Sequence, residues 1–182
     1  MAGRDDPRNR WFVEAVLPHA SAAYNLARWI TRNDADACDV VQEAFARALQ
    51  YFGSYHGGDI RSWLLSIVRN SSYTWVKANV ARGRADSGDS SSAEYDAEHE
   101  LSGNSGDPLG ELVSEDEARR LRAAIAGLPM EYREVLVLRE FEELSYRQIA
   151  TVVGCPIGTV MSRLSRARDE LGVLVRREGR AP

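Results

Sequence analysis

The chain has 182 residues, 44% of them hydrophobic and 27% charged, so it can bury a core as one domain or two small ones. Its formal net charge of −4 argues at first sight against a nucleic-acid partner. Only two cysteines and three scattered histidines are present, which argues against a disulfide framework or a metal site. No metal or other cofactor is expected.

The N-terminal residues 1–10 carry charges of both signs and lack the apolar segment of a signal peptide. The longest stretch without a charged side chain, residues 148–162, has 15 residues and contains glycine and proline. A membrane span needs about 18 apolar residues or more. We therefore expect a cytoplasmic protein with no membrane insertion of its own.

The first half of the chain has the hydrophobic periodicity of helices almost throughout. The pattern predicts a helix over residues 11–31 with a bend at Pro18, a helix over residues 35–52 capped by Asn33 or Asp34, and a helix from residue 60 to about residue 80, after a glycine-containing loop.

The second of these helices has an acidic polar face. At helical spacing Asp39, Gln42, Glu43 and Ala46 share this face, and the apolar side is expected to hold Val41, Phe45, Ala48 and Leu49. Two interpretations stay open for the acidic face. It is either an ordinary solvated surface or a docking surface for a basic or helical partner.

The third helix has a polar face in which basic residues alternate with asparagine and tyrosine, a mixture that suits phosphate contact and base stacking. Trp63 is expected to pack in the core rather than serve as a platform for bases. The polar face holds Ser62, Ser66, Arg69, Asn70, Tyr73 and Lys77, and the buried stripe is expected to hold Leu64, Ile67, Val68, Ser71 and Trp75.

Residues 83–110 are rich in Gly, Ser, Asp and Glu, which predicts a flexible linker. The charge is distributed unevenly around it. Residues 86–117 carry 11 acidic and no basic side chains, whereas residues 1–85 and 118–182 carry net charges of +3 and +4. The chain thus has two mildly basic blocks separated by an acidic segment. This distribution is a better indicator of charged partners than the net charge of the whole chain.

Helices resume at about residue 111. One is expected over residues 112–126, ended by the sequence Gly127-Leu128-Pro129, and another over residues 131–141. The core of the second should include Tyr132, Val135, Leu136 and Leu138.

A pair of short helices then follows. Ser145 and Gln148 form a capping box that starts the first helix, Gly154 suits the left-handed position after its end, and Pro156 suits the first turn of the next. Apolar faces are expected from Ile149, Val152 and Val153 in the first helix and from Ile157, Val160, Leu164, Ala167 and Leu171 in the second.

The opposite face of the second helix is small, polar and basic, as in a helix that reads the DNA major groove. It carries Thr159, Ser162, Ser165, Arg166 and Asp169, flanked by Met161, Arg163 and Arg168. From these residues alone an ordinary helical hairpin with a solvated face stays possible. The fold class is therefore all-α, with two small helical domains joined by a flexible acidic linker and a helix-turn-helix in the C-terminal domain.

The order of the motifs resembles one protein family. Asp39-x-x-Gln42-Glu43-x-Phe45 precedes Arg61-Ser62-Trp63-Leu64-Leu65-x-Ile67-x-Arg69-Asn70, and the helix-turn-helix ends in Ser162-Arg163-Leu164-x-Arg166-Ala167-Arg168. This arrangement resembles the bacterial RNA polymerase sigma factors of the extracytoplasmic-function (ECF) group, small two-domain members of the sigma-70 family. The resemblance spans roughly residues 11–171.

The resemblance implies an alternative sigma factor for transcription initiation, with a role in stress response. Residues 11–82 would be the region-2 domain, which docks on core polymerase and recognises and melts the −10 element. Residues 83–110 would be the acidic linker, and residues 111–176 the region-4 domain, which reads the −35 element. The implied partners are core RNA polymerase through its β′ and β subunits, promoter DNA and an anti-sigma factor.

The resemblance also assigns residues to these contacts. Met161 and Ser165 stand where some relatives carry larger or basic side chains, so the −35 preference is left open. The assignments are Asp39, Gln42, Glu43 and Phe45 for core polymerase; Arg61, Ser66, Arg69, Asn70, Tyr73 and Lys77 for the −10 element; and Thr159, Met161, Ser162, Arg163, Ser165, Arg166 and Arg168 for the −35 element.

The alternative function is a helix-turn-helix regulator that binds operator DNA without polymerase, and the acidic docking helix favours the sigma factor. An enzyme is not expected, because the sequence has no nucleophile and base signature, phosphate-binding glycine loop or metal-ligand spacing. The promoter sequence, regulon and inducing signal are not encoded in any pattern.

Overall fold

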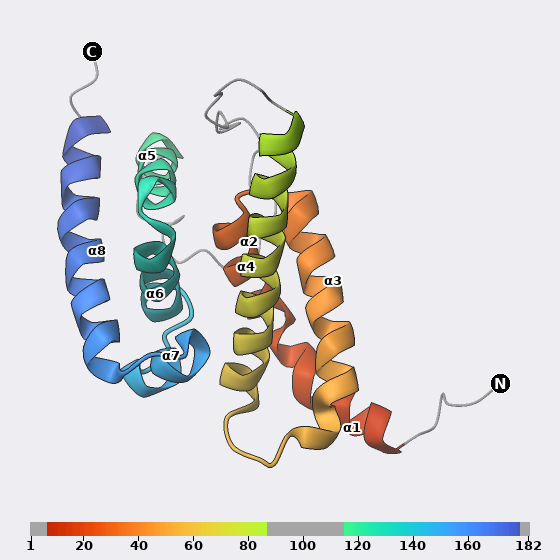
Figure 1. The fold of residues 1–182 in the computed structure, drawn as a ribbon. Helices are drawn as coiled ribbons and strands as arrows, with labels where there is room; N and C mark the ends of the chain where they lie inside the picture. Colours follow the sequence, from red (N-terminus) through yellow and green to blue (C-terminus); the bar gives the residue numbers. More distant parts are fainter. Residues whose placement is uncertain (1–6, 87–114, 179–182) are drawn as a thin grey trace.

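The structure is a computed structural model that describes the backbone of residues 7–86 and 115–178, and the side chains of residues 10–82 and 117–177. All regular structure in these ranges is helical, as the sequence predicts. Figure 1 shows two groups of helices side by side, one from each half of the chain. The N-terminal group comprises α1 (Pro7–Val16), α2 (Ala20–Thr31), α3 (Asp34–Tyr51) and α4 (Ile60–Asp86), with 3₁₀ turns at Leu17–His19 and Phe52–Ser54; the C-terminal group comprises α5 (Glu115–Gly127), α6 (Met130–Glu140), α7 (Tyr146–Val153) and α8 (Ile157–Glu178).

The predicted bend at Pro18 is confirmed, because a 3₁₀ turn at Leu17–His19 separates α1 from α2. Asn33 is the cap of α3, since its side chain accepts a hydrogen bond of 3.1 Å from the backbone N–H of Asp36. The side chain of Asp34 instead binds Arg28 and accepts a hydrogen bond from Tyr24, which ties the start of α3 to α2.

The apolar face of α3 differs from the prediction. Ala48 is buried, as predicted, but the other buried residues are Ala37, Val40 and Ala44, whereas Val41 and Phe45 are only half-buried and Leu49 is 41% exposed. Three of the four buried residues are alanines, which allow α3 to approach α2 and α4 closely. A prediction that ranks positions by hydrophobicity overlooks such a face, because alanine contributes little apolar area.

Helix α4 is longer than predicted. It continues to Asp86 instead of ending at about Val80, and so takes in residues 83–86 of the predicted linker. Alanine and arginine, which dominate positions 81–85, favour helix, and Arg82 donates hydrogen bonds back to the Ala78 carbonyl and the Asn79 side chain. The rest of the predicted linker, residues 87–110, lies outside the described residues.

The helix-turn-helix forms at the predicted positions. Ser145 and Gln148 make a reciprocal capping box at the start of α7, and Gly154 ends α7 in the left-handed conformation at φ +72°. Pro156 precedes α8 instead of lying in its first turn, and its carbonyl accepts from the N–H groups of Thr159 and Val160.

The predicted buried face of α8 is correct except at its first residue. Val160, Leu164 and Ala167 are buried and Leu171 is half-buried, but Ile157 is 41% exposed.

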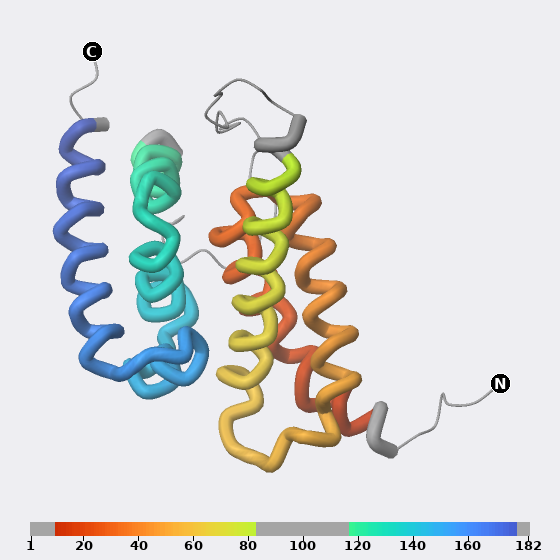
Figure 2. Tube along the Cα trace, in the orientation of Figure 1, coloured from red at the N-terminus to blue at the C-terminus, as the bar shows by residue number. Residues whose placement is uncertain are grey.

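Helix α6 lies at the centre of the molecule and is buried on all sides. Every residue from Arg133 to Leu138 is buried, and α6 packs against α2, α7 and α8. Helix α7 packs against α4, so the two groups of helices share one continuous hydrophobic core. The tube in Figure 2 shows this sandwiched position of α6. The pattern predicted two domains on a tether but gave no indication of this packing.

Two glycines of the helix-turn-helix provide a matched test of how the backbone conformation at each position affects stability. An added methyl group meets no atom within 4 Å at either Gly154 or Gly158, but Gly154 has φ +72° and Gly158 is helical. Gly154→Ala should therefore lower the free energy of unfolding by about 1–2 kcal/mol. Gly158→Ala should raise it by up to about 1 kcal/mol. Urea unfolding measures both, and a loss of stability in the Gly158 variant would contradict this account.

Candidate nucleic-acid interface

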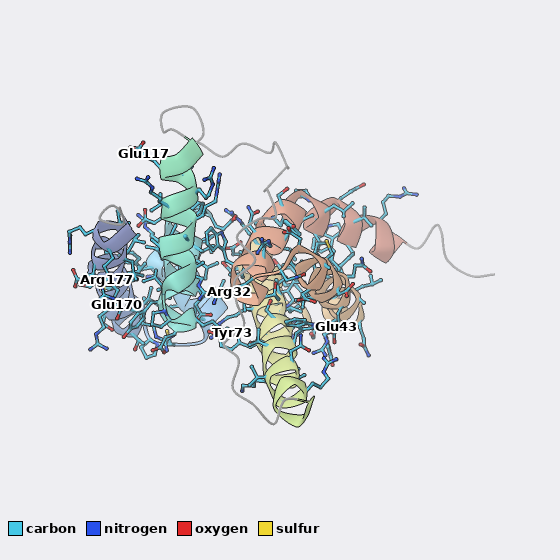
Figure 3. All side chains as sticks on the ribbon, turned by 90° about the horizontal axis from the view of Figure 1, so that it is seen from above. Arg32, Glu43, Tyr73, Glu117, Glu170 and Arg177 are labelled. Carbon is cyan, nitrogen blue, oxygen red and sulfur yellow. The ribbon has the colours of Figure 1, made fainter. Side chains whose placement is uncertain are left out.

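The acidic face of α3 is open to solvent. Asp39, Gln42 and Glu43 are all exposed, as predicted, and Glu43 forms an ion pair of 2.6 Å with Arg47 one turn later. Phe45 is half-buried against the core. Figure 3 shows Glu43 on the side of the N-terminal group that faces away from the C-terminal group. Packing of the two groups therefore leaves this surface accessible.

The predicted reading face of α8 is also largely open. Met161 is 54% exposed, and Ser162, Ser165 and Arg166 are exposed beside it, whereas Thr159 is half-buried. The Ser162 hydroxyl donates 3.0 Å to the Thr159 carbonyl. These side chains form a surface of small polar groups with one thioether and one guanidinium, which has the size and chemistry to contact base edges.

The remaining two arginines of this set are paired with α6. Arg168 is half-exposed and donates 2.7 Å to Glu140. Arg163 is more enclosed, donates 3.0 Å to Glu131 and lies 3.6 Å from Glu134. Arg163 is therefore held at the side of α8 that faces α6, not on its open face.

The polar face of α4 is only partly accessible. Asn70 and Lys77 are exposed, but Arg61, Ser66, Arg69 and Tyr73 are half-buried. The Ser66 hydroxyl donates 2.7 Å to the Trp63 carbonyl of its own helix. Ser62, which the sequence placed on this face, is buried, because its hydroxyl donates 2.6 Å to Asp59 at the start of the helix.

Arg69 of α4 reaches across to Glu134 of α6. Its Nε and one terminal nitrogen donate to the two carboxylate oxygens at 2.6 and 3.1 Å, and the guanidinium lies 4.3 Å from the centre of the Tyr73 ring. Burial would lower the pKa of Arg69, but the Glu134 carboxylate outweighs it and raises that pKa. Burial, followed by the charge of Glu134, raises the pKa of Tyr73 to about 12. Arg69 therefore stays charged and Tyr73 stays neutral at neutral pH.

Two further polar contacts join the start of α4 to the C-terminal group. Arg61 donates 2.6 Å to Glu142, which also accepts 3.2 Å from Asn25. Asp59 accepts from the Gln148 side chain of α7 at 2.6 Å. Burial would raise the pKa of Asp59, but the hydrogen bonds from the Ser62 and Gln148 side chains outweigh it and hold that pKa below its ordinary value.

Aromatic rings surround the loop before α4. Trp63 packs with its ring 5.3 Å from that of Tyr55 and 6.2 Å from that of Phe52, in agreement with the predicted packing role. Tyr55, Trp63, Arg147 and Thr151 contribute to the lining of a cavity of about 400 Å³ between this loop and α7. Helix α7 therefore lies next to the loop that precedes α4.

Sequence reasoning missed the carboxylates of this interface. Glu134 and Glu142 are 1% and 5% exposed, although charged residues are usually taken as surface. The one available signal was the uninterrupted apolar run of residues 135–138, since a helix that is apolar on every side is buried on every side.

Within the ranges that the structure describes, no three His, Cys, Asp or Glu side chains are grouped so as to hold a metal ion. Cys38 and Cys155 are both free thiols. A search of the described helices for a long apolar span of membrane-crossing type finds none.

The fold and these surfaces define a two-part helical protein with a DNA-reading helix-turn-helix, and the comparisons with known proteins identify the class. The model of Sigma-70 region 2 matches residues 15–82, and that of Sigma-70 region 4 matches residues 118–171. The RNA polymerase sigma-H factor of Pseudomonas aeruginosa is 38% identical over 167 residues, which cover 89% of this chain and 84% of that protein. The ECF RNA polymerase sigma-E factor of Escherichia coli K12 is 35% identical over 141 residues, with 75% and 72% covered.

Solved structures show the same fold. The sigma factor RpoE from Bartonella quintana, in complex with the anti-sigma factor NepR, superposes with a TM-score of 0.74 at 24% identity over 92% of this chain and 98% of that one. CnrH, in complex with the cytosolic domain of CnrY, superposes with a TM-score of 0.63 at 22% identity, with 92% and 89% covered. The chain belongs to the ECF group of the sigma-70 family. It is an alternative sigma factor that directs RNA polymerase to promoters, and its family consists of transcription initiation factors, not enzymes.

Asp59 generates a prediction about the entry into α4. Its carboxylate accepts from the backbone N–H of Arg61 and from the Ser62 hydroxyl, as an N-terminal cap does. Asp59→Ala should lower the free energy of unfolding by about 1 kcal/mol at neutral pH, whereas Asp59→Asn, which keeps a cap acceptor, should lose less.

The pH dependence of the same variants gives a control. Because the folded-state pKa of Asp59 is depressed, its charge stabilises the fold above the unfolded pKa, and this contribution is lost as pH falls through the folded pKa. The deficit of both variants relative to the parent chain should therefore shrink in acid during urea unfolding. A deficit that stays constant down to pH 3 would show that the charge of Asp59 makes no contribution.

Proposed function

We propose that residues 11–82 dock on core RNA polymerase and open the −10 element, that residues 111–176 read the −35 element, and that residues 83–110 tether them. The observation that supports this proposal best is the separation of two open surfaces. Helices α3 and α8, which carry the acidic face and the reading face, lie at opposite sides of the molecule (Figures 1 and 3). One chain can therefore contact polymerase and duplex DNA at the same time.

Asp39, Gln42 and Glu43 form the polymerase-docking surface of this proposal. They are exposed on consecutive turns of α3, and the half-buried Phe45 nearby packs against the hydrophobic core. An acidic, amide-containing surface of this kind complements a basic or helical partner, the role assigned to the β′ subunit with a further contact to β.

The −10 contacts are assigned to Arg61, Ser66, Arg69, Asn70, Tyr73 and Lys77 of α4. Asn70 and Lys77 are already exposed for hydrogen bonding to a base edge and for pairing with a phosphate. Tyr73 has a ring on which an unpaired base could stack, and the adjacent guanidinium of Arg69 would strengthen this contact.

The −35 contacts are assigned to the helix α8. Met161, Ser162, Ser165 and Arg166 form its exposed part and are the groups that reach base edges or phosphates. Thr159, Arg163 and Arg168 flank them, and the two arginines reach phosphates once they leave Glu131 and Glu140.

The chain acts in the cytoplasm and is controlled by an anti-sigma factor in this proposal. Support for such control comes from the solved relative that is bound to the anti-sigma factor NepR. The function as a whole is tested by run-off transcription from a random promoter library with core polymerase, followed by sequencing of the transcribed templates. Specific duplex binding by the chain alone, with no transcription in the presence of polymerase, would contradict it.

The docking surface yields a charge-reversal prediction. Asp39→Arg combined with Glu43→Arg should weaken binding to core polymerase by roughly tenfold or more, because like charges then face the partner. Glu14→Arg, an exposed acidic position on α1, is the matched control and should bind as the parent chain does. Fluorescence anisotropy with labelled chain measures both affinities. Equal binding by the double variant and the control would remove α3 from the interface.

The reading face of α8 yields a specificity prediction. Met161 has no strong hydrogen-bond donor, so Met161→Arg should create a preference for guanine at one −35 position, where a good bidentate contact is worth about 1–3 kcal/mol. Arg166→Ala should reduce run-off transcription several-fold, and Arg177→Ala, exposed in the last turn of α8, should not. An unchanged library consensus with the Met161 variant would place this position away from the bases.

A further inference from the structure

Three of the arginines assigned to DNA are bound to carboxylates in this structure. Arg69 makes a two-point contact with Glu134, Arg163 lies 3.6 Å from the same carboxylate, and Arg61 donates to Glu142 at 2.6 Å. Carboxylate and phosphate oxygens take the same two-point hydrogen bonds from a guanidinium. Each of these arginines therefore already holds an anion where a DNA phosphate would bind.

The contacts of Arg61 and Arg69 connect the two halves of the chain, because both arginines lie on α4 and both carboxylates lie in the C-terminal half. Glu134 of α6 also lies 3.6 Å from Arg163 of α8, which donates its hydrogen bond to Glu131. A single carboxylate thus binds an arginine of α4 and lies beside an arginine of α8.

Burial makes these contacts persistent. The side chain of Glu134 has no exposed surface and that of Glu142 is 5% exposed, so neither carboxylate can exchange its arginine for water while the two groups of helices stay together. A buried charge that loses its partner is strongly destabilising. Arg61 and Arg69 can leave these carboxylates only if α4 separates from the C-terminal group of helices.

The same packing covers other groups assigned to the −10 element. Tyr73 is half-buried beneath the Arg69 guanidinium, and Gln148 of α7 holds Asp59 at the start of α4. By contrast, Asp39, Gln42 and Glu43 of α3 are untouched by these contacts. Packing of the two halves therefore blocks DNA contacts selectively and leaves the proposed polymerase-docking surface open.

We propose that Glu134 and Glu142, with Arg61, Arg69 and Arg163, form a carboxylate clasp that covers these arginines and so weakens binding of the free chain to DNA. Phosphates of promoter DNA displace the carboxylates once the two halves separate on polymerase. The clasp rests on the proposed assignment of these arginines to DNA, and its test uses free chain without polymerase, so that the two ideas fail separately.

The first experiment measures binding of the full chain to a random-sequence 30-base-pair duplex as a function of salt. The double variant Glu134→Gln with Glu142→Gln should bind DNA about tenfold more tightly than the parent chain. This factor is expected if about a tenth of the parent chain, but nearly all of the variant, is in the state that binds DNA. The dependence of log affinity on log salt should steepen by up to about 0.9 for each additional phosphate contact. Glu14→Gln with Glu170→Gln is the matched control, because it removes two negative charges at exposed positions of α1 and α8 outside the clasp.

Equal affinity and equal salt dependence for the double variant and the control would overturn the clasp. Circular dichroism and urea unfolding check the fold, and Glu142→Gln alone provides a milder variant if Glu134→Gln does not fold. Run-off transcription with core polymerase should stay within about twofold for all these variants, because polymerase separates the halves in any case. Loss of transcription in Arg69→Ala combined with Glu134→Gln, but not in Glu134→Gln alone, is the separate test of the DNA assignment.

The second experiment needs no substitution in the clasp. Fluorophores are placed on Cys38, exposed on α3, and on Ser165→Cys, exposed on α8, with Cys155→Ser to remove the other thiol. Energy transfer should report one short distance in free chain and a longer one after saturation with core polymerase. A broad distance distribution in the free chain, or an unchanged distance in the complex, would each contradict the proposal.

Discussion

The arrangement of the molecule depends on the burial of α6 together with its two charged side chains, Arg133 and Glu134. Arg133 donates from its terminal nitrogens to the carbonyls of Trp29, Ala126 and Leu128, and Glu134 accepts from Arg69. The carbonyl of Trp29 and the guanidinium of Arg69 both belong to the other half of the chain. Because a buried ion without partners is strongly destabilising, α6 can occupy its central position only when both halves supply those partners. The hydrogen bonds of the two buried charges and the packing of the two halves therefore depend on each other.

This constraint imposes an order on the events of initiation. The face of α3 that is proposed to dock on polymerase stays exposed, whereas three DNA-contacting arginines are occupied. On the proposed assignments, polymerase binds the packed chain first, and separation of the halves on its surface then releases the arginines. A sigma factor with this property does not need a negative net charge to limit its binding to DNA, because individual arginines are already paired with carboxylates.

Local signals could be predicted from the sequence, and contacts between distant segments could not. The capping box at Ser145, the left-handed Gly154 and the bend at Pro18 depend on neighbouring residues, and all three are confirmed. The buried face of α3 was assigned one position too late, because its alanines are small and pack only once α2 and α4 are in place. The acidic face of α3 and the open face of α8 could be found from helical spacing alone. The burial of Glu134 depends on an arginine 65 positions away in the sequence, which no local pattern reports.

The chemistry of arginine makes such an arrangement reversible. A guanidinium keeps its charge and its planar set of donors whether it faces a carboxylate or a phosphate, so the exchange replaces one two-point contact with another. The hydrogen-bond energies of the two states nearly cancel, and the cost of opening comes mainly from separating the apolar surfaces between α6 and α2 and between α7 and α4. That cost is large for DNA alone but is within reach of a polymerase interface that contacts both halves. The positions of the buried carboxylates therefore determine which arginines are paired. The apolar surface between the two halves determines how much binding free energy is needed to separate the halves and release those arginines.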